Sequence, residues 1–207
     1  LIERLLTESM IRGKHATGVS YLKDGEIHTV KNGYSVDRFL DTFDLNEMIN
    51  EDGGVYMIGH IRYSTSDIKY NQPFQGGNIS IAHNGVISQE DPSTWKYDTE
   101  TTNDSELILK SLEAGNNPLT DFRPSSMAVC MLDDSKKVIG FRNESRPLWY
   151  NLTEGGVVFT STKDISVRSG LHNPIKCDMF VIHEYDAAKQ VTNLIPVELG
   201  YKVEDLQ

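Results

Sequence analysis

Four short polar clusters in this sequence contain residue types that do chemistry. They cover residues 12–18, 59–66, 82–85 and 101–106. Each cluster adjoins an apolar segment with strand or helix periodicity, so each is expected at a strand end or a helix start. Polar groups in such places can converge on a shared ligand, or they can serve only the local backbone.

Two of the clusters offer a charge to a ligand. Arg62 ends a buried strand, where an unpaired charge is costly, and its planar fork suits a carboxylate. Tyr63 and Thr65 add donors close by, and Asp104 offers an anion for an ammonium group. Structural alternatives stay open: an internal ion pair for Arg62, and a capping box of Asn103 with Glu106 that would place Asp104 in a first helical turn.

The other two clusters combine glycines with polar side chains. The amide of Asn84 and the backbone N–H of Gly85 are the donor types found in oxyanion holes, although Asn-Gly is also a common turn signal. Residues 12–18 can equally be a helix stop followed by a strand start. Together the four clusters supply a cation, an anion and an oxyanion hole, a set that fits an amino acid whose side-chain carbonyl is attacked.

The elements that must position these clusters are mostly short strands. Periodicity predicts a first helix that is already under way at Leu1 and stops near Gly13, and further helices at 36–49 and 107–112. It predicts strands at 19–22, 27–30, 55–63, 79–83, 127–132, 138–141, 149–150, 157–160, 179–183 and 191–195. The order lacks the regular alternation of a parallel α/β fold, and so favours antiparallel sheets covered by helices. No repeat or linker divides the chain, which predicts one domain over 1–207 with a polar tail after Pro196.

Composition excludes several classes of function. The 207 residues can bury a core, and the net charge of −10 argues against nucleic acid and anionic membranes as partners. No apolar run approaches the roughly 18 residues of a membrane span, and no signal segment is recognised. Cys130 and Cys177 form no metal motif with the six histidines, and this sparse cysteine usage predicts a reducing, cytoplasmic location. No phosphate loop or other cofactor motif is present, so no metal and no cofactor are expected.

In these motifs the chain resembles the glutaminase domain of class II glutamine amidotransferases, within the N-terminal nucleophile hydrolases. The resemblance covers about residues 1–185, leaving 186–207 as a polar extension. It is carried by Arg12-Gly13 with Gly18, His60-Ile61-Arg62-Tyr63-Ser64-Thr65, Gln72-Pro73-Phe74, Ala82-His83-Asn84-Gly85, Asn103-Asp104-Ser105-Glu106, and Arg142 with Arg146-Pro147-Leu148. The Gln-Pro-Phe and Asp-Ser-Glu motifs are closer to the amidophosphoribosyltransferase branch than to the glucosamine-6-phosphate synthase branch.

The resemblance implies an α+β fold and a role for each site residue. The fold is a four-layer αββα sandwich, with two antiparallel sheets between helix layers. Arg62, helped by Tyr63 and Thr65, would hold the α-carboxylate of L-glutamine, and Asp104 its α-ammonium. The remaining roles are an oxyanion hole from Asn84 and Gly85, a closing loop at 64–70, and structural support from Arg12, Gly13 and His83.

The same resemblance implies a nucleophile that this sequence does not contain. The family uses an N-terminal cysteine on a first strand, with its own α-amine as base. Both are expected upstream of Leu1, and Cys130 in an apolar strand or Cys177 near a turn cannot replace the nucleophile. The chain also departs from the family pattern at His15 and Asn143, where aspartate is usual, and at Ser145, where glycine is common. We expect these three changes to alter the packing around the site.

The expected activity is therefore that of a longer protein. It would hydrolyse glutamine to glutamate and ammonia through a cysteinyl thioester, and pass the ammonia to a synthetase subunit or domain. The 207 residues alone are expected to be inactive. The alternatives are a catalytically inactive module that binds glutamine or regulates a partner, and a different amide hydrolase of the same superfamily. A Met-Cys-Gly start upstream would favour the enzyme.

Overall fold

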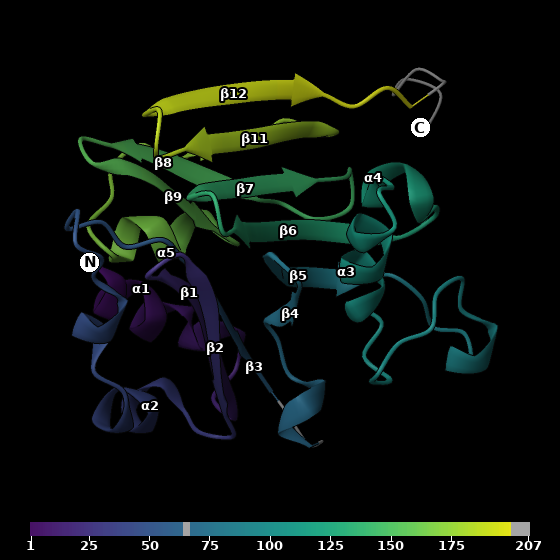
Figure 1. Cartoon of the computed structure of the whole chain (residues 1–207), viewed down its shortest axis with the longest axis horizontal. Helices are drawn as coiled ribbons and strands as arrows, with labels where there is room; N and C mark the ends of the chain where they lie inside the picture. The colour runs from purple at the N-terminus through teal and green to yellow at the C-terminus, as the bar shows by residue number, and fades with distance from the viewer. Residues whose placement is uncertain (64–66, 200–207) are drawn as a thin grey trace.

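The computed structural model describes residues 1–63 and 67–199, and its strands form three antiparallel sheets (Figure 1). Sheet A has the strand order β2 (Glu26–Asn32), β1 (Ala16–Lys23), β3 (Met57–Arg62). Sheet B has the order β12 (Val191–Pro196), β11 (Val181–Asp186), β7 (Lys137–Arg142), β6 (Ser126–Asp133), β5 (Ile79–Val86), β4 (Phe74–Gly76). Sheet C has the order β10 (Ile175–Lys176), β8 (Trp149–Thr153), β9 (Gly156–Thr160).

Strand β6 at the centre of sheet B shows how the layers stack. Its side chains alternate between two faces, as in any strand. On one face Leu132 packs with Leu22 and Ile58 of sheet A, while Ala128 packs in a cluster with the Phe159 ring of sheet C. Sheets A and C therefore lie in one layer against the same face of sheet B.

Helices cover both outer sides of the two sheet layers. On the far face of sheet B, Met127 and Val129 pack against α3 (Glu106–Glu113) and α4 (Pro118–Asp121). On sheet A, Leu6 of α1 (Ile2–Glu8) and Phe39 of α2 (Val36–Thr42) bury Val19, and α5 (Lys163–Arg168) contacts β8 and β9. The order is helix, sheet, sheet, helix, which confirms the predicted αββα architecture.

The predicted helix over 36–49 is wrong in its second half. Helix α2 ends at Thr42, and a separate 3₁₀ turn, η2, covers Leu45–Met48. Asp44 accepts a hydrogen bond from the backbone N–H of Asn46 at 2.9 Å, and this local bond competes with continuing the helix. The first helix likewise ends at Glu8 and continues as the 3₁₀ turn η1 (Ser9–Arg12).

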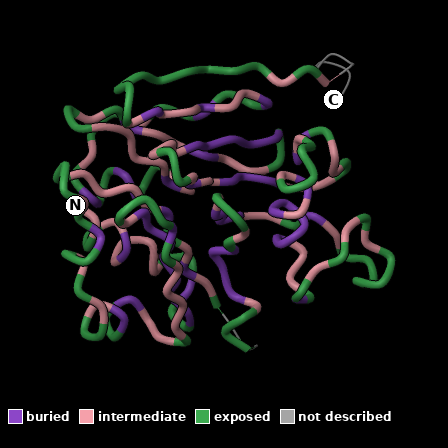
Figure 2. Tube along the Cα trace, in the orientation of Figure 1, coloured by how far each residue is buried: buried purple, intermediate pink, exposed green. Residues whose placement is uncertain are grey.

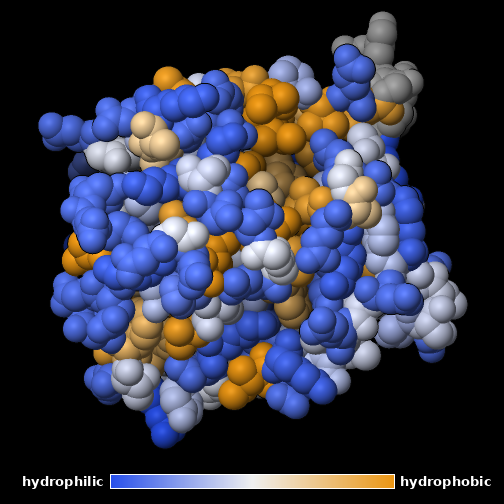
Figure 3. All heavy atoms as spheres, in the orientation of Figure 1, coloured by the Kyte–Doolittle hydropathy of each residue, from blue (hydrophilic) through white to orange (hydrophobic). Residues whose placement is uncertain are grey.

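Several short elements lacked a periodic signal and were not predicted. They are α4, α5, β4, β10 and the 3₁₀ turns η3 (Ile68–Tyr70) and η4 (Pro92–Thr94). By contrast, the predicted strand over 191–195 is present as β12, and it pairs with β11 from Val181↔Pro196 to Asp186↔Val191. Strand β12 is exposed along its whole length (Figure 2), and its exposed residues include the apolar Val191, Leu194 and Ile195. In Figure 3 hydrophobic residues, in orange, lie among hydrophilic ones at the top of the molecule.

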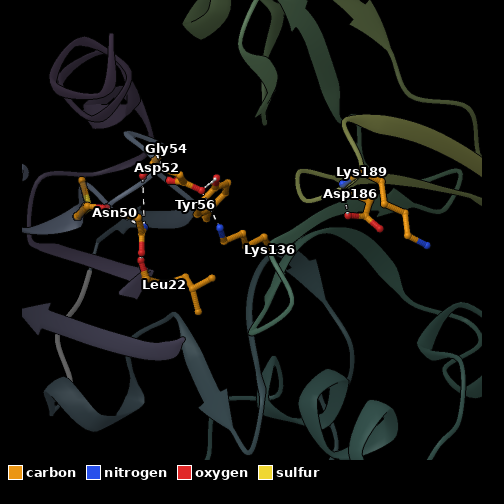
Figure 4. A network of polar contacts seen from close by, with 9 residues as sticks. Leu22, Asn50, Asp52, Gly54, Tyr56, Lys136, Asp186 and Lys189 are labelled. Atoms are coloured by element: carbon orange, nitrogen blue, oxygen red, sulfur yellow. Dashed lines mark hydrogen bonds and ion pairs between the residues drawn. The ribbon is translucent and has the colours of Figure 1, made fainter. Parts of the chain in front are cut away.

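A polar clasp ties sheet A to sheet B at the turn between β6 and β7 (Figure 4). The carboxylate of Asp52 accepts hydrogen bonds from Lys136 Nζ at 2.7 Å, Tyr56 Oη at 2.7 Å and the Gly54 backbone N–H at 2.8 Å. The bond from Lys136, then those from Tyr56 and Gly54, holds the pKa of Asp52 well below its ordinary value. The carboxylate therefore stays ionised, and the clasp holds, through the neutral pH range.

Candidate functional site

A polar cavity of about 570 Å³ lies where β3, β5 and the start of α3 meet. Arg62, Asn84, Gly85 and Asp104 all border it. The remaining lining comes from His60, Tyr70, Gln72, His83, Thr102, Asn103 and Ser105. The structure therefore brings the predicted cation, anion and amide donors to one space, although they come from segments up to 42 residues apart (62 to 104).

Arg62 stands at the end of β3, and its guanidinium makes one hydrogen bond to the part of the chain that the structure describes. Its Nε donates to the Tyr63 carbonyl at 2.9 Å. Within the described residues, no carboxylate lies within ion-pair distance of Arg62, so the alternative of an internal ion pair finds no partner there. Within residues 1–63 and 67–199 no other hydrogen bond of the Arg62 guanidinium is seen, and its N–H groups suit an anionic ligand.

Of the two donors predicted to help Arg62, Tyr63 does not border the cavity, and Thr65 lies outside the described residues. Tyr63 is 62% exposed, and its ring packs edge-on against His15 with the ring centroids 4.8 Å apart. Thr65 and its neighbours at 64 and 66 lie outside the described residues, so three of the seven residues of the predicted closing loop at 64–70 do too. Of that loop, Tyr70 borders the cavity, and its carbonyl accepts a hydrogen bond from Asn103 Nδ2 at 2.6 Å.

Asp104 is held by the backbone that leaves β5. Its Oδ2 accepts from the N–H groups of Ile87 at 2.5 Å and Ser88 at 2.9 Å. Asp104 thus presents a fixed negative charge at the rim of the cavity.

The predicted capping box at the start of α3 is only half formed. Asn103 Oδ1 accepts from the Ser105 N–H at 3.0 Å, as a cap would. Glu106, however, does not reach back to the Asn103 N–H; its oxygens accept from the N–H groups of Glu100 and Thr101, both at 2.8 Å. The buried Glu106 carboxylate therefore anchors the preceding loop to the helix.

Asn84 is oriented by Arg12. The guanidinium Nη2 of Arg12 donates to Asn84 Oδ1 at 2.6 Å, which leaves Asn84 Nδ2 as the donor for a ligand. The next residue, Gly85, has φ of 143°, and a Cβ there would lie 2.0 Å from the Ser126 carbonyl oxygen. Only glycine fits where β5 turns toward the cavity, so this Asn-Gly pair is more than a turn signal.

Two further predicted residues support this arrangement from behind. A Cβ on Gly13 would lie 2.2 Å from the Arg62 carbonyl carbon, so the chain passes β3 at backbone contact. The buried His83 ring contacts Ser105 Oγ at 2.8 Å through Nδ1 and the Ser126 carbonyl at 3.0 Å through Nε2. Burial lowers the pKa of His83 to about 4, so the ring is neutral and links β5 to both neighbouring segments.

Sequence reasoning gave no role to Gln72, which the structure shows to be central. Its buried Nε2 donates to the His83 carbonyl and to Ser105 Oγ, each at 3.1 Å. Gly18 lies beneath it, because a Cβ there would come within 2.2 Å of the Gln72 carbonyl oxygen. The only available signal was the Gln-Pro-Phe motif, since no periodicity marks a buried glutamine.

Asn143, where the resemblance predicts an aspartate, uses both ends of its side-chain amide. Asn143 Oδ1 accepts from the N–H groups of Met127 at 3.0 Å and Ser145 at 3.1 Å. Its Nδ2 donates to the Ser125 carbonyl at 2.8 Å, a bond that an ionised aspartate could not make. The Asn143 substitution is thus fully accommodated by its neighbours.

A second, largely apolar cavity of about 440 Å³ separates sheet A from sheet C. It is bordered by β3, by β9 and by α1, and neither β3 nor β9 has a strand partner on this side in the described chain. His60, Arg62, His83 and Asn84 border both cavities. The apolar groove therefore meets the polar cavity beside the Asn84 amide.

Neither cysteine borders the polar cavity. Burial raises the pKa of both Cys130 and Cys177 to about 12, so both are neutral thiols at physiological pH. Because the thiolate is the reactive form, neither is a nucleophile. In the described part of the chain, no group of three His, Cys, Asp or Glu residues could hold a metal ion, and no helix is long and apolar enough to cross a membrane.

The chain is similar in sequence to amidophosphoribosyltransferases. No family model matches the chain. Amidophosphoribosyltransferase of Methanothermobacter thermautotrophicus is 36% identical over 113 residues, covering 49% of this chain and 23% of the relative. That of Methanocaldococcus jannaschii is 32% identical over 173 residues, covering 72% of this chain and 36% of the relative. These matches relate this chain to the amidophosphoribosyltransferase branch, in agreement with its resemblance to class II glutamine amidotransferase domains.

Solved structures show the same fold. Glutamine phosphoribosylpyrophosphate amidotransferase from B. subtilis, complexed with ADP and GMP, matches with a TM-score of 0.69 and 18% identity over 93% of this domain. A structure described as the allosteric regulatory enzyme of purine biosynthesis matches with a TM-score of 0.68 and 17% identity over 95%. The chain spans 45% and 46% of those two chains, and 23% and 36% of the two relatives above.

Proposed function

We propose that this domain hydrolyses L-glutamine to glutamate and ammonia through a cysteinyl thioester, and that the ammonia passes to a synthetase domain or subunit. The observation that carries the proposal is the convergence of Arg62, Asp104 and the Asn84 amide on one 570 Å³ cavity. An α-amino acid presents a carboxylate, an ammonium and a side-chain carbonyl, which are complementary to these three groups.

In this pose Arg62 binds the α-carboxylate and Asp104 the α-ammonium. Asn84 Nδ2 and the Gly85 N–H donate to the carbonyl oxygen of the carboxamide as it becomes an oxyanion. Arg12 holds the Asn84 amide in the donating orientation through its 2.6 Å bond to Oδ1. Donors that are already oriented need no reorganisation during the reaction.

The nucleophile is proposed to be a cysteine on a segment that precedes Leu1. The 440 Å³ groove between the unpaired edges of β3 and β9 is suited to an extended strand, and it opens beside Asn84. A thiolate delivered there would attack the carboxamide carbon, and the C–N bond would break as the α-amine of the cysteine returns the thiol proton to the leaving ammonia. Water would then hydrolyse the thioester, releasing glutamate and the free thiol.

The test is glutamine hydrolysis by the protein with its natural upstream segment. We expect glutamate and ammonia in equal amounts, and covalent labelling of one upstream cysteine by a glutamine-mimicking electrophile, seen by mass spectrometry of the intact protein and its peptides. Replacement of that cysteine by alanine should abolish both signals, while Cys130→Ala should preserve them.

Other outcomes separate the alternatives. Glutamine binding without hydrolysis, alone or with the synthetase partner, would favour a binding or regulatory module. Hydrolysis of a different amide in preference to glutamine would indicate another hydrolase of the superfamily. Either result would overturn the proposal.

A further inference from the structure

The histidine of β3 has an unused hydrogen-bonding atom where the two cavities meet. His60 borders both the polar cavity and the apolar groove. Its Nδ1 is buried and has no hydrogen-bond partner within the described residues. A buried acceptor or donor without a partner is rare in folded proteins, and one beside a cavity points to a ligand atom.

The chemical character of this atom follows from its surroundings. Burial, followed by the charge of Arg62, lowers the pKa of His60 to about 3, so the ring is neutral. A neutral imidazole carries one ring proton, and with that proton on Nε2 the unpartnered atom is Nδ1. In this tautomer Nδ1 is an acceptor only.

The position of His60 on the strand places its side chain beside that of Arg62, at the border of both cavities. His60 and Arg62 are two residues apart on β3, so their side chains leave the same face about 7 Å apart. This spacing is about the length of glutamine from its α-carboxylate to its carboxamide. A ligand held by Arg62 at one end would therefore present the other end between His60 and Asn84.

We propose that His60 is a specificity-determining residue, whose Nδ1 accepts a hydrogen bond from the side-chain amide N–H of bound glutamine. The inference rests on the proposed function. A carboxamide has an acceptor oxygen and a donor nitrogen, matching the Asn84 donor and the His60 acceptor together. The side-chain carboxylate of glutamate has two acceptor oxygens and no donor. One oxygen would face the Asn84 donor and the other the lone pair of His60 Nδ1, and repulsion at the second contact would weaken binding of the product.

The test measures ligand preference without turnover. The protein carries its natural upstream segment with the proposed nucleophilic cysteine replaced by alanine, and calorimetry compares L-glutamine with L-glutamate γ-methyl ester, which keeps the carbonyl and lacks the N–H. Wild-type His60 should favour glutamine by about three- to ten-fold, the range of one neutral hydrogen bond. His60→Phe should remove the preference, and His60→Asn, which returns an acceptor oxygen near the Nδ1 position, should restore most of it.

His183→Phe is the matched control. It replaces another buried histidine, on β11, that borders neither cavity, and it should leave the preference unchanged. Imidazole ¹⁵N NMR gives a second measurement that needs no variant: the His60 Nδ1 resonance should move when glutamine binds and should not move when the ester binds.

Three results would overturn the inference. His60→Phe could retain the preference, or His60→Asn could lose as much as His60→Phe, or the Nδ1 resonance could respond equally to both ligands. If the wild type hydrolyses glutamine and one of these occurs, only the role of His60 fails. If the wild type binds no glutamine, the proposed function fails with it.

Discussion

At the scale of single residues, two arginines serve the polar cavity in different ways. Arg62 has no carboxylate partner among the described residues and offers its guanidinium to a ligand. Arg12 donates to Asn84 Oδ1 and acts on a ligand only through that amide. Burial, then the charge of Arg146, lowers the pKa of Arg12, but a guanidinium remains charged at physiological pH.

Replacing Arg62 by alanine should weaken glutamine binding. A hydrogen bond to a charged group contributes about 1.5–3 kcal/mol, or about 10- to 100-fold in affinity. The measurement is the dissociation constant of L-glutamine by calorimetry. Arg168→Ala on the exposed face of α5 is the control and should bind as the wild type does, and an Arg62→Ala protein with unchanged affinity would contradict the assignment.

Arg12→Ala should change the rate more than the binding. Without its partner the Asn84 amide rotates freely, so the oxyanion donor is present but no longer fixed. We expect kcat for glutamine hydrolysis to fall at least about ten-fold, approaching the roughly 10²–10³-fold loss expected for Asn84→Ala, with KM changed less than about three-fold. A rise in KM with constant kcat would instead place Arg12 in ground-state binding.

At the scale of elements, the cavity depends on backbones that approach closely. Gly18 in β1 contacts the Gln72 carbonyl, and Gln72 in turn bonds His83 of β5 and Ser105 before α3. A strand, a loop and a helix start are thus fixed to one another through a single buried glutamine. The contacts of Gln72 therefore fix the distances between the segments that carry the site residues.

Gly18→Ala should destabilise the protein and disturb the cavity together. The new Cβ would lie 2.2 Å from the Gln72 oxygen, so the loop must move, at a cost of about 1–3 kcal/mol in the free energy of unfolding. Urea unfolding checks the stability, and glutamine affinity checks the cavity. Gly155→Ala, in open space at the β8–β9 turn, should stay within about 0.5 kcal/mol of the wild type; equal effects at both glycines would refute the argument.

At the scale of the whole molecule, neutral histidines are buried between the layers. Burial is the main cause that lowers the pKa of His60 to about 3 and of His83 to about 4, against about 6.5 in an unfolded chain. Below pH 6.5 the unfolded chain therefore binds more protons than the folded one. The contribution of these histidines to the free energy of unfolding is therefore fully present above pH 6.5 and is lost as the pH falls.

The free energy of unfolding should decline between pH 6.5 and about pH 4. Each such histidine adds a slope of at most about 1.4 kcal/mol per pH unit. His60→Phe should lower the slope by about that amount, because one of the titrating groups is gone. Urea unfolding at pH 7, 6, 5 and 4.5 measures this, and parallel curves for wild type and variant would contradict the buried, neutral state of His60.

The sequence by itself was enough for the family, the layer order and most of the strands. Alternating or continuous apolar runs such as 127–132 indicate buried strands. The motifs around Arg62, Asn84 and Asp104 contain charged and amide side chains that the local backbone rarely needs, and these side chains indicate a binding site. The helix over 36–49 was overestimated because an apolar spacing continues past Thr42, whereas the Asp44 side chain begins a new turn.

Only the tertiary structure decided which polar residues meet. Gln72 and Arg12 gain their hydrogen-bond partners from strand β5, which is distant from them in sequence. His60 Nδ1 is buried without a partner among the residues that the structure describes. The tertiary structure also moved Tyr63 away from the cavity and gave Glu106 to the loop at 100–101 instead of the Asn103 cap. Periodicity records which face of an element is buried, but the partner across that face is set by how sheets and helices pack, and no single segment encodes that packing.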